Sequence, residues 1–194
     1  MKNIPLFIAL LFICFSSCKT IKPVADKNNK ATRGQVTSSE PVSQPVNFSD
    51  QVTWLLGYFD PSRLAHEPYS IWYIKGYDDY QANPEAVNGL LEINKDNLSV
   101  KVVMGTWCPD SRREVPRFMR VLDAWHFPVD KVTFIGVDNA KLSPVGEYDK
   151  LDIQRVPTFI IYKNNIEAGR IIENPSTSLE QDMVNILTGM NNNK

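Results

Sequence analysis

The feature that most constrains the fold of this 194-residue chain is an apolar run that turns into a helix at a cysteine. Ser99–Thr106, with the sequence SVKVVMGT, has the short apolar pattern of a buried strand. Pro109–His126 follows with apolar side chains at helical spacing. Proline suits the first helical position, because its missing N–H leaves no hydrogen bond unmade. The pattern therefore places Cys108 at the corner between a buried strand and a helix.

A cysteine at the start of a helix occupies a position that favours the thiolate. The unpaired N–H groups and the positive end of the helix dipole lie near its sulfur. Cysteines in such positions have pKa values of roughly 3.5 to 7.5, below the usual value of about 8.5. Arg112 and Arg113 follow within one turn and favour the same form, whereas Asp110 opposes it. The alternative is a buried, unreactive cysteine.

Elsewhere the pattern alternates strands and helices. The predicted elements are a helix from 84 to 92 or 93, the strand 99–106, the helix 109–126, a strand 131–138, a short helix 148–151, strands 158–163 and 167–172, and a helix 178–187. Asn164-Asn165 predicts a tight hairpin turn, because asparagine tolerates the left-handed conformation. This order predicts an α/β fold, a mixed central sheet with helices on its faces.

Two segments before residue 84 are less regular. Ser49 or Asp50 is expected to begin a helix with one apolar face, which Asp60-Pro61-Ser62 ends. The members of that face are Val52, Leu55, Leu56 and Phe59. The aromatic stretch EPYSIWYIKGYDDYQANP follows, and its part 71–74 fits either a strand or a helical turn. Its Tyr and Trp side chains are expected to pack on the domain; a carbohydrate or peptide platform is the alternative.

The N-terminus has the pattern of a targeting segment. Lys2 precedes the apolar stretch Ile4–Phe15, which is too short to span a membrane. Phe15-Ser16-Ser17-Cys18 resembles the lipobox of bacterial lipoproteins, which implies cleavage before Cys18 and lipid attachment to its sulfur. Ordinary signal cleavage or a core helix is the alternative. We expect a signal peptide at 1–18, a flexible tether at 19–47, an extension packed on the domain at 48–83, and the main domain at 84–190.

This reading leaves one free thiol. Cleavage removes Cys14 and the lipid caps Cys18, so Cys108 cannot form a disulfide within its own chain. The expected location is the cell envelope, with a lipid-anchored protein on the periplasmic side or in the outer membrane.

The composition argues against several classes of function. A net charge of −1 without a basic stripe gives no basis for nucleic-acid binding. Two histidines and three cysteines supply few metal ligands, so we expect no metal or cofactor, and His66 and His126 are assigned no chemistry. Helix 109–126 carries a basic face, expected to be solvated or, alternatively, to bind a partner; its members are Arg113, Arg117 and Arg120.

Three motifs in order resemble the thioredoxin superfamily. Trp107-Cys108-Pro109-Asp110-Ser111 resembles the family's Trp-Cys-x-x-Cys site, and Pro116 matches the proline within its active-site helix. Val156-Pro157-Thr158 resembles the family's cis-proline loop before its β-hairpin. The resemblance covers roughly residues 84–187. It implies a thioredoxin-like three-layer sandwich, here with an N-terminal helical and aromatic extension.

The resemblance also implies roles for individual residues. Cys108 is the nucleophile, and Trp107 shields it and shapes the docking surface. Pro157 is cis and lies beside the sulfur, and the backbone of Val156 pairs with an extended substrate. The expected substrate-binding set comprises Trp107, Pro109, Val156, Pro157 and Thr158.

Two departures from the family pattern point to monothiol chemistry. Ser111 stands where the resolving cysteine is expected; its hydroxyl cannot form a disulfide, but it can donate a hydrogen bond to the Cys108 thiolate. Val102 stands where dithiol members carry a buried acid. Both losses fit a protein without a second thiol to deprotonate.

We therefore expect thiol–disulfide exchange of the reductase or isomerase type. Cys108 would attack a protein or low-molecular-weight disulfide, and an external thiol reductant would release the product. The alternative is a non-catalytic peptide-binding or redox-sensing module. A peroxidase is disfavoured because the Pro-x-x-x-Thr-x-x-Cys context of peroxiredoxins is absent.

Overall fold

The computed structural model describes residues 54–189, whose centre is a five-stranded mixed sheet. Its strands are β1 (Gly57–Phe59), β2 (Leu98–Met104), β3 (Val132–Gly136), β4 (Thr158–Lys163) and β5 (Ile166–Ile172). They lie in the order β1-β3-β2-β4-β5. Strands β2 and β3 are parallel, and the other neighbouring pairs are antiparallel. The expected α/β class with a mixed sheet is confirmed.

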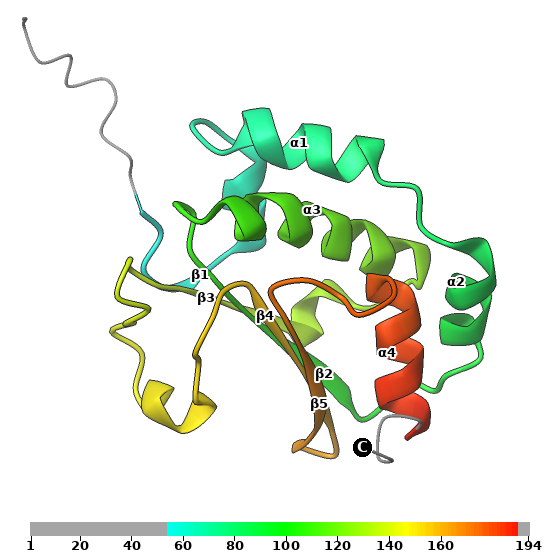
Figure 1. Cartoon of the computed structure of the whole chain (residues 1–194). Coiled ribbons are helices and arrows are strands. Elements are labelled where there is room, and N and C mark those ends of the chain that lie inside the picture. Colours follow the sequence, from blue (N-terminus) through cyan, green and yellow to red (C-terminus); the bar gives the residue numbers. More distant parts are fainter. Residues whose placement is uncertain (1–53, 190–194) are drawn as a thin grey trace, which may run out of the picture. The chain divides into compact units, whose positions relative to one another are not determined.

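Four α-helices accompany the sheet. They are α1 (Ser70–Asp79), α2 (Pro84–Leu91), α3 (Pro109–Ala124) and α4 (Leu179–Thr188), and three 3-10 turns are η2 (Pro61–Ala65), η3 (Val129–Lys131) and η4 (Tyr148–Leu151). The side chain of Asn83 accepts hydrogen bonds at the start of α2, and Ser178 does so for α4. Figure 1 shows α1 running alongside α3, and α2 alongside α4.

The two faces of the sheet carry different cores, because successive strand residues point to opposite sides. Val102 of β2 and Phe134 of β3 face α3 and belong to the larger cluster, where Phe118 stacks on Phe159 at 4.2 Å. Their neighbours along the strands, Val103 and Ile135, belong to a smaller cluster on the other face. The larger cluster holds α3 and α4 on the sheet.

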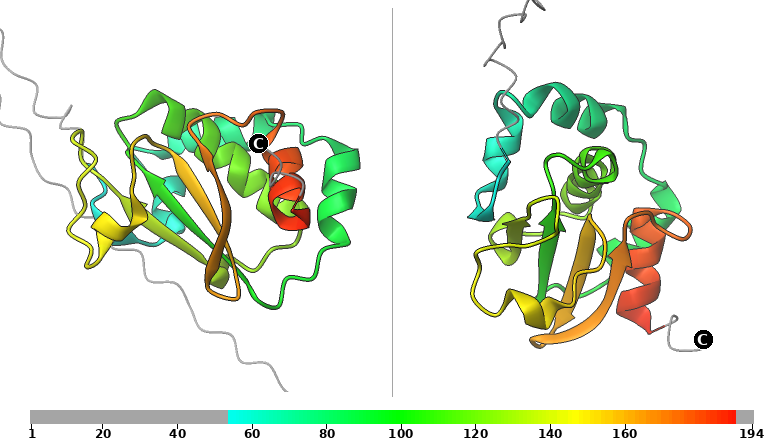
Figure 2. Two further views of the ribbon diagram at one scale, coloured as in Figure 1. Left: turned by 60° about the horizontal axis from the view of Figure 1, so that its bottom comes forward. Right: turned by 60° about the vertical axis from the view of Figure 1, so that its left-hand side comes forward.

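The smaller cluster lies beneath the loop that joins β3 to β4. Tyr148 of η4 packs there against Val103 and Ile135, and Figure 2 shows this loop on the opposite side of the sheet from α3. Arg170 of β5 donates to the carbonyl oxygen of Leu151 at 2.9 Å and so ties η4 to the sheet. The arrangement is compatible with a three-layer α/β sandwich.

Most predicted elements are confirmed to within two or three residues. Strand β4 has the predicted bounds, and α3 begins at the predicted Pro109. Asn164 and Asn165 both have left-handed φ values, 54° and 61°, as the hairpin turn requires. The stretch 71–74 is helical, within α1.

The expected helix ending at Phe59 is wrong over its described part. Gly57–Phe59 forms β1, an edge strand paired antiparallel with Phe134–Gly136. Asp60 then accepts a hydrogen bond from the Ser62 N–H and begins η2. Apolar spacing over a few residues fits either element, and the free edge of β3 decides for the strand. Ser49, Asp50 and Val52 lie outside the described residues.

The basic face of α3 is exposed at Arg113 and Arg120, as expected, and half-buried at Arg117, and two of its arginines contact aromatic rings. The guanidinium of Arg117 lies over the ring of Tyr80 at 5.6 Å, and that of Arg120 over Tyr77 at 5.4 Å. The Tyr77 hydroxyl also donates to Asp123 of α3. The aromatic stretch thus packs on the domain, as predicted, through contacts with arginines.

The predicted signal peptide, lipid-attachment Cys18 and tether 19–47 lie outside the described residues. Within 54–189 the helices are too short and too polar to cross a bilayer.

Candidate functional site

Cys108 lies at the corner between β2 and α3, as predicted. It precedes the first helical residue, Pro109, with extended backbone angles (φ −79°, ψ 125°). Its N–H donates to the Gly105 carbonyl at 2.9 Å, and its carbonyl accepts from the Arg112 N–H at 3.0 Å. These backbone bonds fix the sulfur at the positive end of α3.

The sulfur faces the loop before β4. The Cys108 thiol donates to the carbonyl oxygen of Val156, with Sγ and oxygen 3.2 Å apart, and the residue is only 7 % exposed. The peptide bond between Val156 and Pro157 is cis, as the resemblance implied. Residues 48 positions apart in sequence thus meet at the thiol.

Trp107 covers the corner from the side of β3. Its Nε1–H donates to the Val137 carbonyl at 3.1 Å, and its ring packs on the cluster that contains Cys108 and Val156. The ring lies directly over Gly105, where an added Cβ would come within 2.5 Å of it. Glycine is therefore required at this position for the tryptophan to fold back over the corner.

Ser111 occupies the position of the missing second thiol and is fully buried. Its hydroxyl oxygen accepts a hydrogen bond from the Gly105 N–H at 3.3 Å. The expected bond from Ser111 to the Cys108 thiolate stays a prediction. Val102, in place of the buried acid, is fully buried in β2.

The loop of Val156, Pro157 and Thr158 is braced on both sides. The Pro157 carbonyl accepts from the Glu173 N–H at 2.7 Å, and the Thr158 hydroxyl donates to the Arg155 carbonyl at 2.7 Å. Within residues 54–189 the N–H of Val156 donates to no protein group. This N–H is the backbone group beside the thiol that an extended ligand could pair with.

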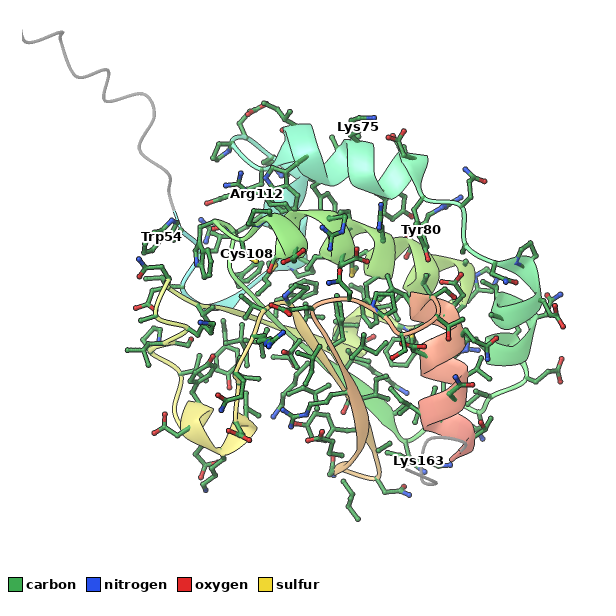
Figure 3. All side chains as sticks on the ribbon, in the orientation of Figure 1. Trp54, Lys75, Tyr80, Cys108, Arg112 and Lys163 are labelled. Carbon is green, nitrogen blue, oxygen red and sulfur yellow. The ribbon has the colours of Figure 1, made fainter. Side chains whose placement is uncertain are left out.

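Arg112 points back toward the corner. Its Nε donates to the Thr106 carbonyl at 2.6 Å. Thr106 is two residues before Cys108, so this bond holds the guanidinium near the corner. Figure 3 shows Arg112 between the start of α3 and α1, near Cys108. Its neighbour Arg113 instead pairs with Asp110 at 2.7 Å and Glu114 at 2.6 Å.

A groove of about 450 Å³ lies between α1 and α3, and Pro109 at the start of α3 belongs to its lining. Its lining residues are Trp72, Lys75, Gly76, Asp79, Tyr80, Pro109, Arg112, Arg113 and Arg117. The sequence did not reveal it, because the groove depends on how two helices pack. The available signal was the spacing of Trp72, Gly76 and Tyr80, which places them on one face of a helix.

Buried acids stabilise the walls of this groove. Glu114 is 3 % exposed and accepts from Arg113 and Arg117, while Glu180 accepts from the Tyr80 hydroxyl at 2.9 Å. Burial, and then the Glu180 carboxylate, raise the pKa of Tyr80 well above its usual value, so its hydroxyl stays protonated and donates.

The two histidines take no part in these arrangements. His66 contacts the Ser62 carbonyl through Nδ1, and His126 is exposed after α3. No group of three His, Cys, Asp or Glu side chains in the part of the chain from 54 to 189 is arranged to hold a metal ion.

Comparisons with known proteins give a fold and no activity. No family model and no curated protein matches the chain. A crystal structure of a protein of unknown function from Pseudomonas aeruginosa is similar, with a TM-score of 0.50 and 11 % identity over 71 % of this chain and 94 % of that one. An HIV epitope-scaffold has a TM-score of 0.43 and 12 % identity, over 64 % and 83 % of the two chains. The similarity to the Pseudomonas aeruginosa protein concerns the fold alone.

Proposed function

We propose that this chain is a thioredoxin-like protein of the cell envelope that performs monothiol thiol–disulfide exchange through Cys108. The observation that carries the proposal is the meeting of the Cys108 sulfur, at the start of α3, with Val156 of the cis-proline loop at 3.2 Å. The strand order and the hairpin after Pro157 support the same family.

The reaction proceeds in two displacements. The thiol proton leaves to solvent, and the Cys108 thiolate attacks one sulfur of a disulfide. The old S–S bond breaks, its other sulfur leaves with the electron pair, and a mixed disulfide remains on Cys108. An external thiolate then attacks that mixed disulfide and restores the Cys108 thiol, because Ser111 cannot do so.

The surroundings of the sulfur support each role. Cys108 lies at the positive end of the α3 dipole, and Trp107 packs against the cluster that contains it. The N–H of Val156, which donates to no group of residues 54–189, is available to an acceptor on an extended substrate. Ser111 supplies a hydroxyl close to the corner in place of a second thiol.

A second candidate is a non-catalytic peptide-binding or redox-sensing module. The low exposure of Cys108 and the hydrogen bond from its thiol to the Val156 carbonyl favour this candidate. Thiol reactivity separates the two candidates.

The test uses the full chain in neutral detergent with Cys14 and Cys18 replaced by serine, so that Cys108 is the sole thiol. The rate at which dithiothreitol reduces a two-chain peptide disulfide is measured with and without the protein. We expect acceleration that Cys108→Ser abolishes, and a mixed disulfide detectable by mass when dithiothreitol is limiting. Equal rates with Cys108 and with Ser at this position would sink the exchanger proposal.

A further inference from the structure

The groove between α1 and α3 has the size and chemistry of a small-ligand site. Its volume of about 450 Å³ falls within the range of roughly 300–1,000 Å³ usual for such sites. Trp72 and Tyr80 provide aromatic walls, and arginines of α3 provide the polar groups. A groove of this kind suits a small anion with an apolar part better than a protein segment.

The charges of the groove leave one cation without an acid. Lys75 pairs with Asp79, and Arg113 pairs with Asp110. The buried Glu114 is shared by Arg113 and Arg117. Among the lining cations of the described chain, Arg112 alone has no carboxylate partner.

The geometry of Arg112 prepares it for a ligand. Its Nε is held by the Thr106 carbonyl at 2.6 Å, and within residues 54–189 neither Nη group makes a hydrogen bond. A guanidinium held at one nitrogen presents its remaining N–H groups in a fixed plane, which matches the two oxygens of a carboxylate.

The groove and the thiol share the start of α3. Pro109 belongs to the wall of the groove, and Cys108 is the preceding residue. Gly76 of α1, also in this wall, lies close to Pro116 of α3, since a Cβ at Gly76 would come within 2.7 Å of the Pro116 ring. A molecule that is joined to the Cys108 sulfur and passes over Pro109 would reach a groove lined by cationic and aromatic side chains.

We propose that this groove binds the carboxylate end of a small, negatively charged thiol or disulfide, with Arg112 as its anchor. This assignment rests on the exchange function and names the low-molecular-weight partner class of the same thiol. The mixed disulfide forms and resolves by the two displacements described above. Arg112 is a binding residue and takes no part in the transfer of electrons.

The kinetic test uses two aromatic disulfides that differ in charge. These are 5,5′-dithiobis(2-nitrobenzoate), a dianion, and 4,4′-dithiodipyridine, which is neutral at pH 7.5. The full chain with Cys14→Ser and Cys18→Ser is compared with the same chain carrying Arg112→Gln. The control is Arg120→Gln, on α3 but outside the groove. For each protein, the rate constant for reaction of Cys108 with the dianion is divided by that for the neutral disulfide. A change in the reactivity of the thiol itself affects both rate constants and cancels in this ratio.

We expect Arg112→Gln to lower this ratio about tenfold, as the loss of a charge-assisted hydrogen bond implies, and Arg120→Gln to leave it within twofold of wild type. An unchanged ratio in Arg112→Gln, or an equal fall in Arg120→Gln, would overturn the assignment.

Equilibrium dialysis separates this inference from the exchange function. With Cys108→Ala added, the dianion can bind only without a covalent bond. We expect saturable binding of about one probe per chain, weakened about tenfold by Arg112→Gln. Wild-type protein that is folded but unreactive to both disulfides contradicts the exchange function only. Absence of saturable binding, or binding indifferent to Arg112→Gln, contradicts the groove assignment.

Discussion

The sulfur of Cys108 lies 3.2 Å from the carbonyl oxygen of Val156, the residue before a cis-proline. This contact joins the start of α3 to the loop before β4 across the end of the sheet. The sulfur is therefore flanked by both elements. The predictions that follow concern this corner and the helices that support it.

Introducing a second thiol tests the geometry of the corner. Ser111 lies three residues after Cys108, on the same face of α3, so Ser111→Cys is expected to form a reversible disulfide with Cys108. Free-thiol counting after mild oxidation, in the chain without Cys14 and Cys18, should give none for this variant. The control Asp110→Cys lies two residues from Cys108 on a different face and should keep two. Two persistent thiols in Ser111→Cys would contradict the inferred geometry.

The packing of α1 on α3 depends on a glycine. A Cβ at Gly76 would lie 2.7 Å from the Pro116 ring, so Gly76→Ala should lower the free energy of unfolding by about 1–3 kcal/mol despite the better helix propensity of alanine. Gly89→Ala in α2 is the matched control, because its nearest neighbour, Val184, lies 3.4 Å away. It should be neutral or stabilising by up to about 1 kcal/mol. Denaturant unfolding measures the free energy of unfolding of both variants. Equal changes in Gly76→Ala and Gly89→Ala would show that α1 is not closely packed on α3.

The buried carboxylate of Glu114 holds two arginines of the groove. Glu114→Gln removes a charge that accepts from Arg113 at 2.6 Å and Arg117 at 3.0 Å, and should destabilise the fold by about 1–3 kcal/mol. Glu147→Gln breaks an exposed pair with Lys150 and should change stability by less than about 0.5 kcal/mol. Urea midpoints at pH 7 give the comparison, and similar midpoints for both variants would contradict a structural role for Glu114.

Alkaline pH should weaken the α1–α3 contact through Tyr73. Burial, and then the charges of Asp123 and Tyr77, raise the pKa of Tyr73 from 10.0 to about 12. Because the folded state holds this proton more tightly, the contribution is complete below pH 10 and is lost as pH rises toward 12. The slope of the unfolding free energy against pH gives the number of protons that unfolding releases. Tyr73→Phe should lower that number by up to about one between pH 10 and 12. Tyr58→Phe, an exposed ring, is the control; equal slopes for the two variants would contradict burial as the cause.

Local patterns predicted the elements whose signals lie within a few residues. Thr158–Lys163 is an apolar run ended by two asparagines, and it formed β4 with the predicted bounds. Cys108 was placed correctly because the strand before it and the proline after it both signal a boundary. That the cis-proline loop would lie beside the sulfur was implied only by the resemblance, since no local rule joins residues 48 apart.

The errors arose where distant parts of the chain decide the structure. Gly57–Phe59 is a strand because β3 offers a free edge, and the sequence before residue 60 does not contain that information. The contacts of Arg117 with Tyr80 and of Arg120 with Tyr77 could not be predicted, because the two rings come from a distant part of the sequence. The groove at Arg112 was hidden for the same reason.

The most direct test of the account compares the reactivity of the Cys108 thiol in the native protein with its reactivity in the unfolded protein. The rate constant for iodoacetamide is measured at pH 7 on the full chain with Cys14→Ser and Cys18→Ser, with and without denaturant. The account predicts that the native thiol reacts faster than the unfolded one, because only the folded chain places Cys108 at the positive end of α3 beside the cis-proline loop. A native thiol that reacts more slowly would contradict the exchange function and leave Cys108 as a protected residue of a binding module.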